Sequence, residues 1–416
     1  MNSNMTQGVS RRSFMRILGA ASAAATALPA FAGTQQPTTQ ASPSARRGNG
    51  MRGTPLSPDT VIISSNENPL GPAQSALAAI GVTATQGGRY HFDEYVKTIS
   101  VFNEQFGLKD GYSALYPGSG GPLDLALMSN IGPDKPLVYG DPSYEQGPRA
   151  AEVMKAPKYP VPLTATYAHD VRAMVRANPS PGAYYIVNPN NPTGTMTPKA
   201  DLVWLVNNKP KGSVVIIDEA YHHFSDDESC IDLVAQDKDV IVMRTFSKIY
   251  GMAGLRAGFA VARPDLIERF SNVGGPSRSL ASISITSAAA ARASLQDKDL
   301  VSLRKKINSD IRSETLEFLT KRGYKIVPGS QGNMFMVDVR RPGKEFQMAM
   351  LQENVAIGRT WSAMPNYVRV TVGTKAEMEK FQTAFVKCMD MPPGAANGAA
   401  ALHLPEFHVP SELYRG

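Results

Sequence analysis

Short apolar runs alternate along this chain with longer stretches in which apolar residues recur every three or four positions. The clearest runs are YYIV at 184–187 and VVII at 214–217. Both are rich in aromatic or β-branched residues and are bounded by turn residues, as buried strands are. Such runs alternate with helical stretches over about residues 83–295. This alternation predicts a mostly parallel sheet with helices on both faces, so the fold class is α/β.

A second periodic region begins near residue 296. Apolar residues at helical spacing there predict one long amphipathic helix: Leu303, Ile307, Ile311 and Leu316. The helix leads into a smaller α/β region with strands near 334–339 and 368–372. The basic run Arg304-Lys305-Lys306 falls on this helix and is predicted to be a solvated face, so nucleic-acid binding is not expected.

The N-terminus has a different pattern. Arg11-Arg12 precedes an apolar, alanine-rich stretch and a small-x-small site at 30–32, which together look like a twin-arginine signal over residues 1–32. Residues 33–58 are rich in Ser, Thr, Pro, Gln and Gly and are predicted to be a disordered linker. The apolar stretch is shorter than the about 20 residues of a membrane span, so we expect an exported, periplasmic protein without stable membrane association. The alternative is an amphipathic N-terminal helix of a cytoplasmic enzyme.

Composition narrows the picture further. A chain of 416 residues exceeds one ordinary core, so two domains of unequal size are expected. The net charge of +7 includes three arginines of the signal and is a mild excess. Cys230 and Cys388 permit one disulfide in an oxidising compartment. The six histidines show no metal-ligand spacing with cysteine, so no metal site is predicted.

The candidate chemistry centres on one lysine. Lys248 follows Thr245-Phe246-Ser247 and precedes Arg256 by eight positions. An amine condenses with an aldehyde only as the free base, which a partly desolvated pocket beside a positive charge favours. The hydroxyls of Thr245 and Ser247 and the guanidinium of Arg256 are suited to bind a phosphate. This set fits pyridoxal 5'-phosphate (PLP) with Lys248 as the Schiff-base lysine; the alternative is a solvated surface lysine.

Two strand ends supply further groups. Asp218 and Tyr221 follow the run at 214–217, and Asn191 follows the run at 184–187. Open α/β sheets bind ligands at the carboxyl ends of their strands. We therefore predict that Asp218 keeps the pyridine nitrogen protonated by ion pairing, and that Tyr221 and Asn191 hydrogen-bond the phenolic oxygen. Alternatively, Asp218 caps a helix and the segment around Asn191 is only a rigid turn.

A glycine-rich turn precedes a helical pattern at residues 123–128. Gly120 and Gly121 allow backbone N–H groups to approach a phosphate at a helix N-terminus. The third glycine of the dinucleotide fingerprint is missing, so a nicotinamide cofactor is not favoured. Pro122 has no N–H and removes one donor, unless it simply begins the helix.

These motifs occur in an order that resembles a known family. From about residue 60 to 385 the chain looks like the class I/II aminotransferases of PLP fold type I (aspartate aminotransferase-like), and it is most similar to the histidinol-phosphate aminotransferase branch. The matching segments are NENPLGP at 66–72, RY at 89–90, PSY at 142–144, NPNNPTG at 188–194, DEAY at 218–221, the stretch 245–258, and RVTVG at 369–373. The resemblance implies an N-terminal arm over 59–82, a large PLP-binding domain over 83–295 and a small C-terminal domain over 296–390. The tail over 391–416 exceeds the family pattern.

The resemblance also implies roles that pattern alone leaves open. Tyr144 would stack on the cofactor ring, and Tyr90 would reach the phosphate of a neighbouring subunit, which implies a homodimer. Arg369 would hold the substrate's carboxylate or phosphate, with Arg359 as a second arginine near the pocket. Asn68 lies in the arm, which runs along the active-site mouth in this family, and is a candidate substrate contact.

The predicted activity is PLP-dependent transfer of an amino group from an amino acid, or a similar amine, to a 2-oxo acid. Decarboxylases, lyases, racemases and oxidases share the first step on this fold and are the alternative; a non-catalytic PLP-binding module is a third reading. Two departures from the branch bear on the substrate. His91 stands where proline is usual, and Pro122 stands in a loop that usually has a small residue and an acid. Export also favours a donor outside histidine synthesis.

Overall fold

The computed structural model describes residues 56–274, 283–392 and 394. The predicted signal, nearly all of the predicted linker and the tail from residue 395 lie outside the described residues. No helix in the described part is long and apolar enough to cross a membrane.

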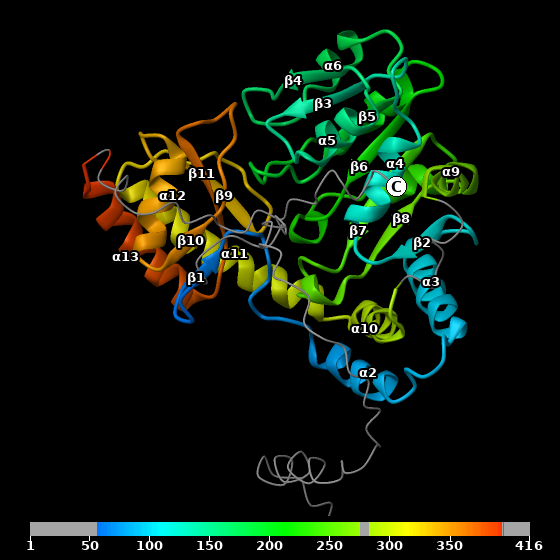
Figure 1. Ribbon diagram of the computed structural model, residues 1–416, viewed down its shortest axis with the longest axis horizontal. Coiled ribbons are helices and arrows are strands. Elements are labelled where there is room, and N and C mark those ends of the chain that lie inside the picture. The colour runs from blue at the N-terminus through cyan, green and yellow to red at the C-terminus, as the bar shows by residue number, and fades with distance from the viewer. Residues whose placement is uncertain (1–55, 275–282, 393, 395–416) are drawn as a thin grey trace, which may run out of the picture. The chain divides into compact units, whose positions relative to one another are not determined.

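A seven-stranded sheet forms the centre of the large domain (Figure 1). Its strand order is β2-β8-β7-β6-β5-β3-β4. The strands are β2 (Ser113–Tyr116), β3 (Leu137–Asp141), β4 (Lys158–Pro162), β5 (Ala183–Val187), β6 (Val214–Asp218), β7 (Val240–Thr245) and β8 (Gly258–Val261). The strands from β7 to β4 are parallel, and β8 is antiparallel to both of its neighbours. The predicted mostly parallel sheet is confirmed, and so are its two clearest strands.

Alternate side chains of each strand face opposite layers of helices. In β5, Tyr184 and Ile186 belong to one apolar cluster, whereas Tyr185 and Val187 belong to another. The first cluster includes α3 (Phe92–Phe106), α6 (Val171–Ala177), α7 (Lys199–Asn208), α8 (Ile231–Ala235) and α10 (Ile285–Gln296), and the second includes α4 (Gly120–Met128), α5 (Gln146–Val153) and α9 (Pro264–Gly274). Because both faces are covered, the strand is a continuous apolar run.

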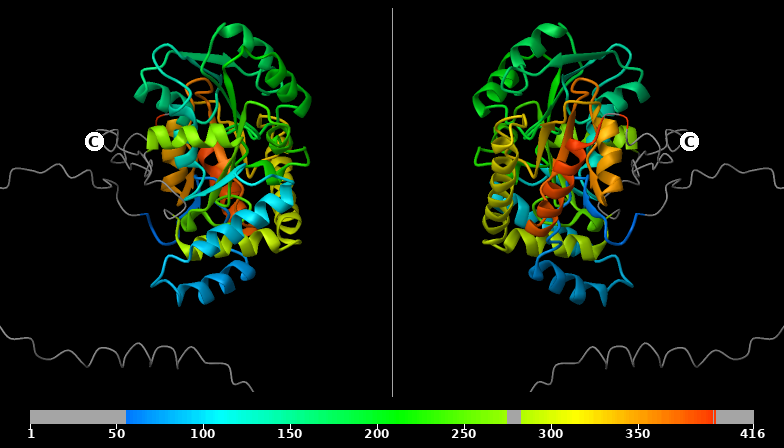
Figure 2. Two further views of the ribbon diagram at one scale, coloured as in Figure 1. Left: turned by 90° about the vertical axis from the view of Figure 1, so that its right-hand side faces the viewer. Right: turned by 90° about the vertical axis from the view of Figure 1, so that its left-hand side faces the viewer.

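The small domain has its own apolar core. Its strands β9 (Met334–Asp338) and β11 (Tyr367–Thr371) pair antiparallel, in agreement with the two predicted strands. Its helices are α11 (Leu300–Lys321), α12 (Gly343–Gln352) and α13 (Lys375–Asp390). Helices α11 (yellow) and α13 (red-orange) contact each other beside these strands (Figure 2).

The N-terminal arm contributes to both domains. Its strand β1 (Val61–Ile63) pairs in parallel with β10 (Val355–Ile357) of the small domain. Its helix α2 (Gln74–Ala84) packs against α10 of the large domain. The predicted arm is therefore divided between the domains, and residues 64–73 cross from one to the other.

Helix α11 differs from its prediction at two positions. Leu303 is 58% exposed, although it was expected on the apolar stripe. Arg304 is 6% exposed, although it was expected on a solvated face. The buried residues of this helix include Leu300, Arg304, Thr315 and Leu319. These positions are separated by four or eleven residues, which is about one or three helical turns, so position 304, rather than 303, lies on the buried stripe.

The two cysteines are free and buried. Cys230 belongs to an apolar cluster of the large domain, and Cys388 belongs to the core of the small domain. The disulfide that the sequence permitted is therefore absent between these two described residues.

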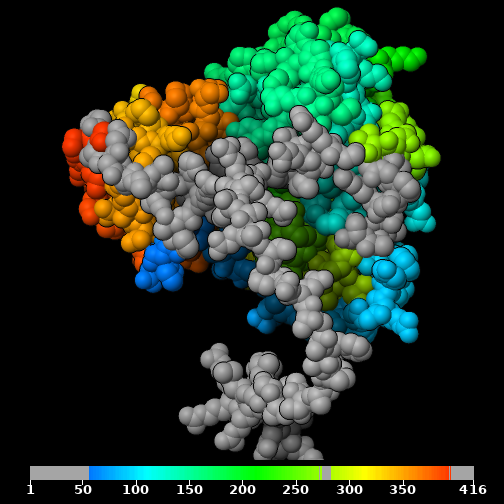
Figure 3. Space-filling model, in the orientation of Figure 1, coloured from blue at the N-terminus to red at the C-terminus, as the bar shows by residue number. Residues whose placement is uncertain are grey.

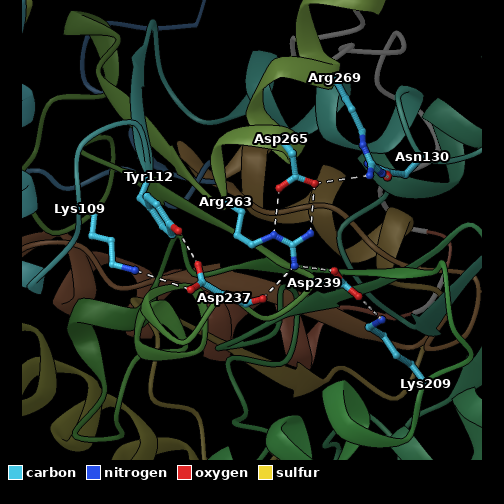
Figure 4. Close-up of polar contacts among 9 residues, drawn as sticks. All are labelled: Lys109, Tyr112, Asn130, Lys209, Asp237, Asp239, Arg263, Asp265 and Arg269. Atoms are coloured by element: carbon cyan, nitrogen blue, oxygen red, sulfur yellow. Dashed lines mark hydrogen bonds and ion pairs between the residues drawn. The ribbon is translucent and has the colours of Figure 1, made fainter.

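A polar network stabilises the amino end of β7 (Figure 4). Arg263 donates from Nη1 to Asp239 Oδ1 at 2.8 Å and from Nε to Asp265 Oδ1 at 2.9 Å. Lys209 Nζ donates to Asp239 Oδ2 at 3.0 Å. Because β7 begins one residue after Asp239, these contacts hold the end of the sheet that is opposite to Thr245.

The two domains also meet through an aromatic contact. In Figure 3 the orange surface of the small domain touches the green surface of the large domain. Trp361 belongs to a cluster against which Tyr167 packs, and its Nε1 donates to the Ser143 carbonyl at 3.1 Å. This contact joins the small domain to the segment that carries Tyr144.

Candidate active site

The predicted site residues gather where β5, β6 and β7 end. Asn191 follows β5, Asp218 ends β6, and Thr245 ends β7 three residues before Lys248. Arg369 comes from β11 of the small domain, and its Nη1 donates to Asn191 Oδ1 at 2.7 Å. The carboxyl edge of the parallel strands is therefore the site's floor, as expected for an open α/β sheet.

Lys248 lies within this group. Its Nζ donates to the Ser65 carbonyl at 3.2 Å and lies 5.4 Å from the centroid of the Tyr221 ring. Burial, followed by the positive charge of Arg369, lowers the pKa of Lys248 from 10.5 to about 8. The free base that carbonyl chemistry needs is therefore accessible near neutral pH.

Asp218 is a buried carboxylate without a cation in contact. Its Oδ1 accepts from the Ala220 N–H at 3.1 Å, and its Oδ2 accepts from the Tyr185 hydroxyl at 3.4 Å. Among the described residues no ion pair includes it, and burial raises its pKa to about 6. A buried carboxylate of this kind is suited to receive a cationic ligand atom, as the ring nitrogen of PLP is.

Tyr221 and Asn191 are oriented by neighbours on the arm and the small domain. The Tyr221 hydroxyl accepts from Asn66 Nδ2 at 3.0 Å. Since Arg369 holds the side-chain oxygen of Asn191, the Asn191 amide Nδ2 is directed away from that contact and is able to donate to a ligand. The two groups fit a shared phenolic oxygen.

The groups predicted to bind phosphate form a connected cup. Thr245 Oγ1 donates to Ser247 Oγ at 3.0 Å, and Arg256 Nη1 donates to the same Ser247 oxygen at 3.3 Å. A Cβ at Gly118 would lie 2.2 Å from Arg256 Nη2, so only glycine leaves room for this guanidinium. The residues present therefore fit an anionic group.

The first turn of α4 lies beside this cup. Gly120 and Gly121 are its first two residues, and its first backbone bond runs from the Leu123 N–H to the Ser119 carbonyl. Pro122 is the third residue of the helix, not its first, and it lies in a turn whose nitrogens have no intrahelical partner. The helix N-terminus thus keeps donors at both glycines.

A second arginine and an aromatic ring lie on the small-domain side. Arg359 Nη2 pairs with Glu145 Oε2 at 2.6 Å, and its Cζ lies 5.3 Å from the Trp361 ring centroid. Arg369 lies on the same ring at 5.4 Å. Tyr144 is partly buried nearby, and burial raises its pKa to about 12. Trp361 was not predicted; its position two residues after Arg359 was the available signal.

Two predicted contacts remain, Tyr90 and Asn68. Tyr90 is 70% exposed and stacks on Phe92 with ring centroids 5.7 Å apart, and its contact with a neighbouring subunit stays a prediction. Asn68 donates from Nδ2 to the Ile249 carbonyl at 3.0 Å and accepts from the Leu70 N–H at 3.1 Å. Its side chain is therefore engaged within the protein.

Asn66 is a further site residue that sequence reasoning missed. It is fully buried, and its φ of 53° is a left-handed conformation that asparagine tolerates better than most residues. It donates to the Tyr221 hydroxyl, and its Oδ1 accepts from Thr371 Oγ1 at 2.9 Å. Asn66 therefore joins the site to β11, and its place in the recognised arm motif was the signal that could have identified it.

The fold and this site define a PLP-dependent transferase of the aminotransferase type. Residues 59–385 match the model of the family described as aminotransferase class I and II. The chain belongs to this family, so the predicted family, enzyme class and cofactor are confirmed, and the other PLP reactions gain no support.

Named relatives agree with this assignment. The chain is 31% identical over 340 residues to histidinol-phosphate aminotransferase 1 of Nitrosococcus oceani, which covers 80% of this chain and 89% of that protein. It is 32% identical over 349 residues to an aromatic amino acid aminotransferase of Cutibacterium acnes, and this match covers 80% of this chain and 96% of that protein. Histidinol-phosphate aminotransferase-like enzymes are thus its relatives, as predicted.

Solved structures share the fold. A putative histidinol-phosphate aminotransferase from Erwinia carotovora atroseptica superposes with a TM-score of 0.74 at 29% identity, covering 79% of this chain and 95% of that chain. The histidinol-phosphate aminotransferase of Sinorhizobium meliloti, solved in complex with PLP, has a TM-score of 0.73 at 23% identity, covering 79% and 90%. The predicted PLP fold type I is confirmed.

Proposed function

We propose that Lys248 is the catalytic lysine of this aminotransferase. The observation that supports this most directly is its Nζ, which has a lowered pKa and lies among Tyr221, Ser65 and the charge of Arg369. When bound, PLP supplies an electron sink for the bond broken at the donor's α-carbon. Lys248 Nζ accepts the α-proton as a general base and gives it up again as a general acid.

The remaining predicted site residues are proposed as the other cofactor contacts. Asp218, with a pKa of about 6, is ionised at neutral pH and holds a proton on the ring nitrogen by ion pairing. Tyr221 and Asn191 donate to the phenolic oxygen. The phosphate is bound by the cup of Thr245, Ser247 and Arg256 and by the backbone of Gly120 and Gly121, and Tyr144 stacks on the ring.

The donor is proposed to be an α-amino acid whose carboxylate binds Arg369. Arg369 contacts the neutral oxygens of Asn191 and Ser64, and its Nε has no hydrogen-bond partner among the described residues. The charge of Arg359, in contrast, is offset by Glu145 at 2.6 Å. One uncompensated arginine matches a carboxylate monoanion better than a phosphate dianion. The side chain of the donor would lie toward Trp361, which favours an aromatic amino acid.

A half-reaction screen tests this proposal. Purified holoprotein is mixed anaerobically with L-phenylalanine, L-aspartate or histidinol phosphate, and the visible band of the bound cofactor is followed as it converts to the aminated form. We expect phenylalanine to convert it fastest, and a 2-oxo acid to reverse the change. Arg369→Gln should raise the KM for phenylalanine far more than the matched Arg359→Gln. Fastest conversion by histidinol phosphate would refute the carboxylate proposal.

We further propose a homodimer in which Tyr90 completes the partner's phosphate site. The exposed apolar side chains Tyr90, Phe92 and Val96, at 70%, 58% and 61% exposure, support an interface along α3. Sedimentation of the holoprotein should give twice the mass of one chain, which is 44.7 kDa at full length, and Tyr90→Ala should weaken cofactor binding. A monomer with full activity would contradict this.

Export by the twin-arginine route is proposed on the sequence of residues 1–32. The mature protein is expected in the periplasm with this segment removed. Replacement of Arg11 and Arg12 by lysine should retain the protein in the cytoplasm. Full-length protein in the cytoplasm of cells carrying the unaltered gene would refute the proposal.

A further inference from the structure

Arg304 is a buried arginine without an acidic partner among the described residues. Its Nη1 donates to the Ile249 carbonyl at 2.9 Å and its Nη2 to the Gly71 carbonyl at 2.6 Å. Burial lowers its pKa. A guanidinium held by two neutral carbonyls loses much of its hydration without gaining an ion pair, so bulk stability alone does not account for this choice of residue.

The two carbonyls belong to segments that are close together at the active site. Ile249 immediately follows Lys248, and Gly71 lies in the arm. Between them, Gly251 has a φ of +64°, and a Cβ added there would lie 2.1 Å from the Gly71 carbonyl oxygen and 2.9 Å from Arg304 Nη1. Residues 248–251, here called the lysine turn, therefore fit against the arm and the Arg304 guanidinium without space for one further carbon atom.

The arm segment fixed in this way contacts three of the site residues. The Ser65 carbonyl accepts from Lys248 Nζ at 3.2 Å. The Ser64 carbonyl accepts from Arg369 Nη2. The next arm residue, Asn66, donates to the Tyr221 hydroxyl. A shift of the arm against the lysine turn would therefore displace the groups on both sides of Lys248.

We propose that Arg304 is a positioning residue that holds the Lys248 turn and the N-terminal arm in register through the Ile249 and Gly71 carbonyls. This inference rests on the proposed role of Lys248. Arg304 acts through backbone and touches neither donor nor cofactor. Its planar fork reaches two acceptors at a fixed separation, which a single ammonium does not reproduce.

The same helix offers a matched control. Arg312 is also on α11, its pKa is also lowered by burial, and its Nη1 also donates to a backbone carbonyl, that of Gly332. Gly332 belongs to the small domain and not to the lysine turn. Arg312→Met therefore removes a partly buried arginine–carbonyl contact of the same helix without releasing Lys248.

The test compares Arg304→Met, Arg304→Lys and Arg312→Met in the full chain. With phenylalanine as the donor, we expect Arg304→Met to lower kcat at least tenfold while the KM changes less than threefold. The kcat of Arg304→Lys should lie between that of Arg304→Met and that of the parent protein. Arg312→Met should keep kcat within twofold. The midpoint temperature of thermal unfolding should fall by a similar amount in the two methionine variants.

A second readout does not use the loaded enzyme. In the cofactor-free protein, the pH midpoint for acylation of Lys248 should move upward in Arg304→Met and stay unchanged in Arg312→Met, because a released lysine regains water. Equal kcat and equal midpoints in the Arg304 and Arg312 variants would overturn the inference. If Arg304→Met does not fold, a parental kcat and midpoint in Arg304→Lys overturn it. Absence of amino transfer by the parent protein would instead refute the proposed function, and the acylation midpoints would still test Arg304.

Discussion

Lys248 in the cofactor-free protein provides the most quantitative prediction. Its pKa is lowered from 10.5 to about 8, mainly by burial and then by the charge of Arg369. At pH 7 a pKa of about 8 leaves roughly one amine in ten unprotonated, whereas a pKa of 10.5 leaves about one in 3,000. The folded site therefore holds about 300 times more free amine than the same lysine in water.

Competitive acylation measures this directly. A trace of an amine-selective reagent is added to the apoprotein over a range of pH, and the peptide that contains Lys248 is quantified by mass spectrometry. The midpoint should lie near pH 8 in the folded protein and near 10.5 for the same lysine in urea, which is the internal control. Arg369→Gln should raise the folded midpoint, because a neighbouring positive charge disfavours the protonated amine. Equal midpoints in folded and unfolded protein would refute the reasoning.

Three further substitutions are predicted. Asp218→Asn should weaken PLP binding by about 10²–10⁴-fold, since a buried ion pair stripped of one partner costs about 3–5 kcal/mol; equilibrium dialysis measures it, and unchanged affinity would contradict the role of Asp218. Glu219→Ala removes the anion 2.9 Å from the buried Arg244 and should lower the free energy of unfolding in urea by about 3–5 kcal/mol, whereas a change under 1 kcal/mol would be inconsistent with that ion pair. Gly251→Ala imposes a Cβ at positive φ, 2.1 Å from the Gly71 oxygen, and should cost at least about 1–3 kcal/mol; a variant as stable as the parent would contradict the close contact.

Several of the predicted site residues that the structure brings together lie at strand ends. Asp218 and Asn191 each follow an apolar run that the sequence identified, and the parallel order of β5 and β6 brings such positions to one edge. The local pattern and the general rule that ligands bind at the carboxyl ends of parallel strands were therefore sufficient to predict that these positions lie close together. Lys248 and the phosphate cup were predicted instead from the residue types within one short segment, residues 245–256.

The parts that could not be predicted depend on contacts between distant segments. Asn66 bonds to Tyr221 across 155 residues, and Arg304 bonds to Gly71 across 233. The burial of Arg304 was also not predictable from its neighbours in sequence, because it lies in a basic run and such runs are usually solvated. Strand β1 has three residues, too few for a periodic signal, and forms only because β10 provides an edge.

The identity of the cofactor-bearing lysine is tested most directly by borohydride reduction of the holoprotein followed by peptide mass spectrometry. Reduction makes the bond between cofactor and protein permanent, so the modified residue is read from the mass of one peptide. The cofactor mass should appear on the peptide that contains Lys248 and should be lost in Lys248→Ala. Its appearance on another lysine, or its persistence in that variant, would contradict the account of this active site.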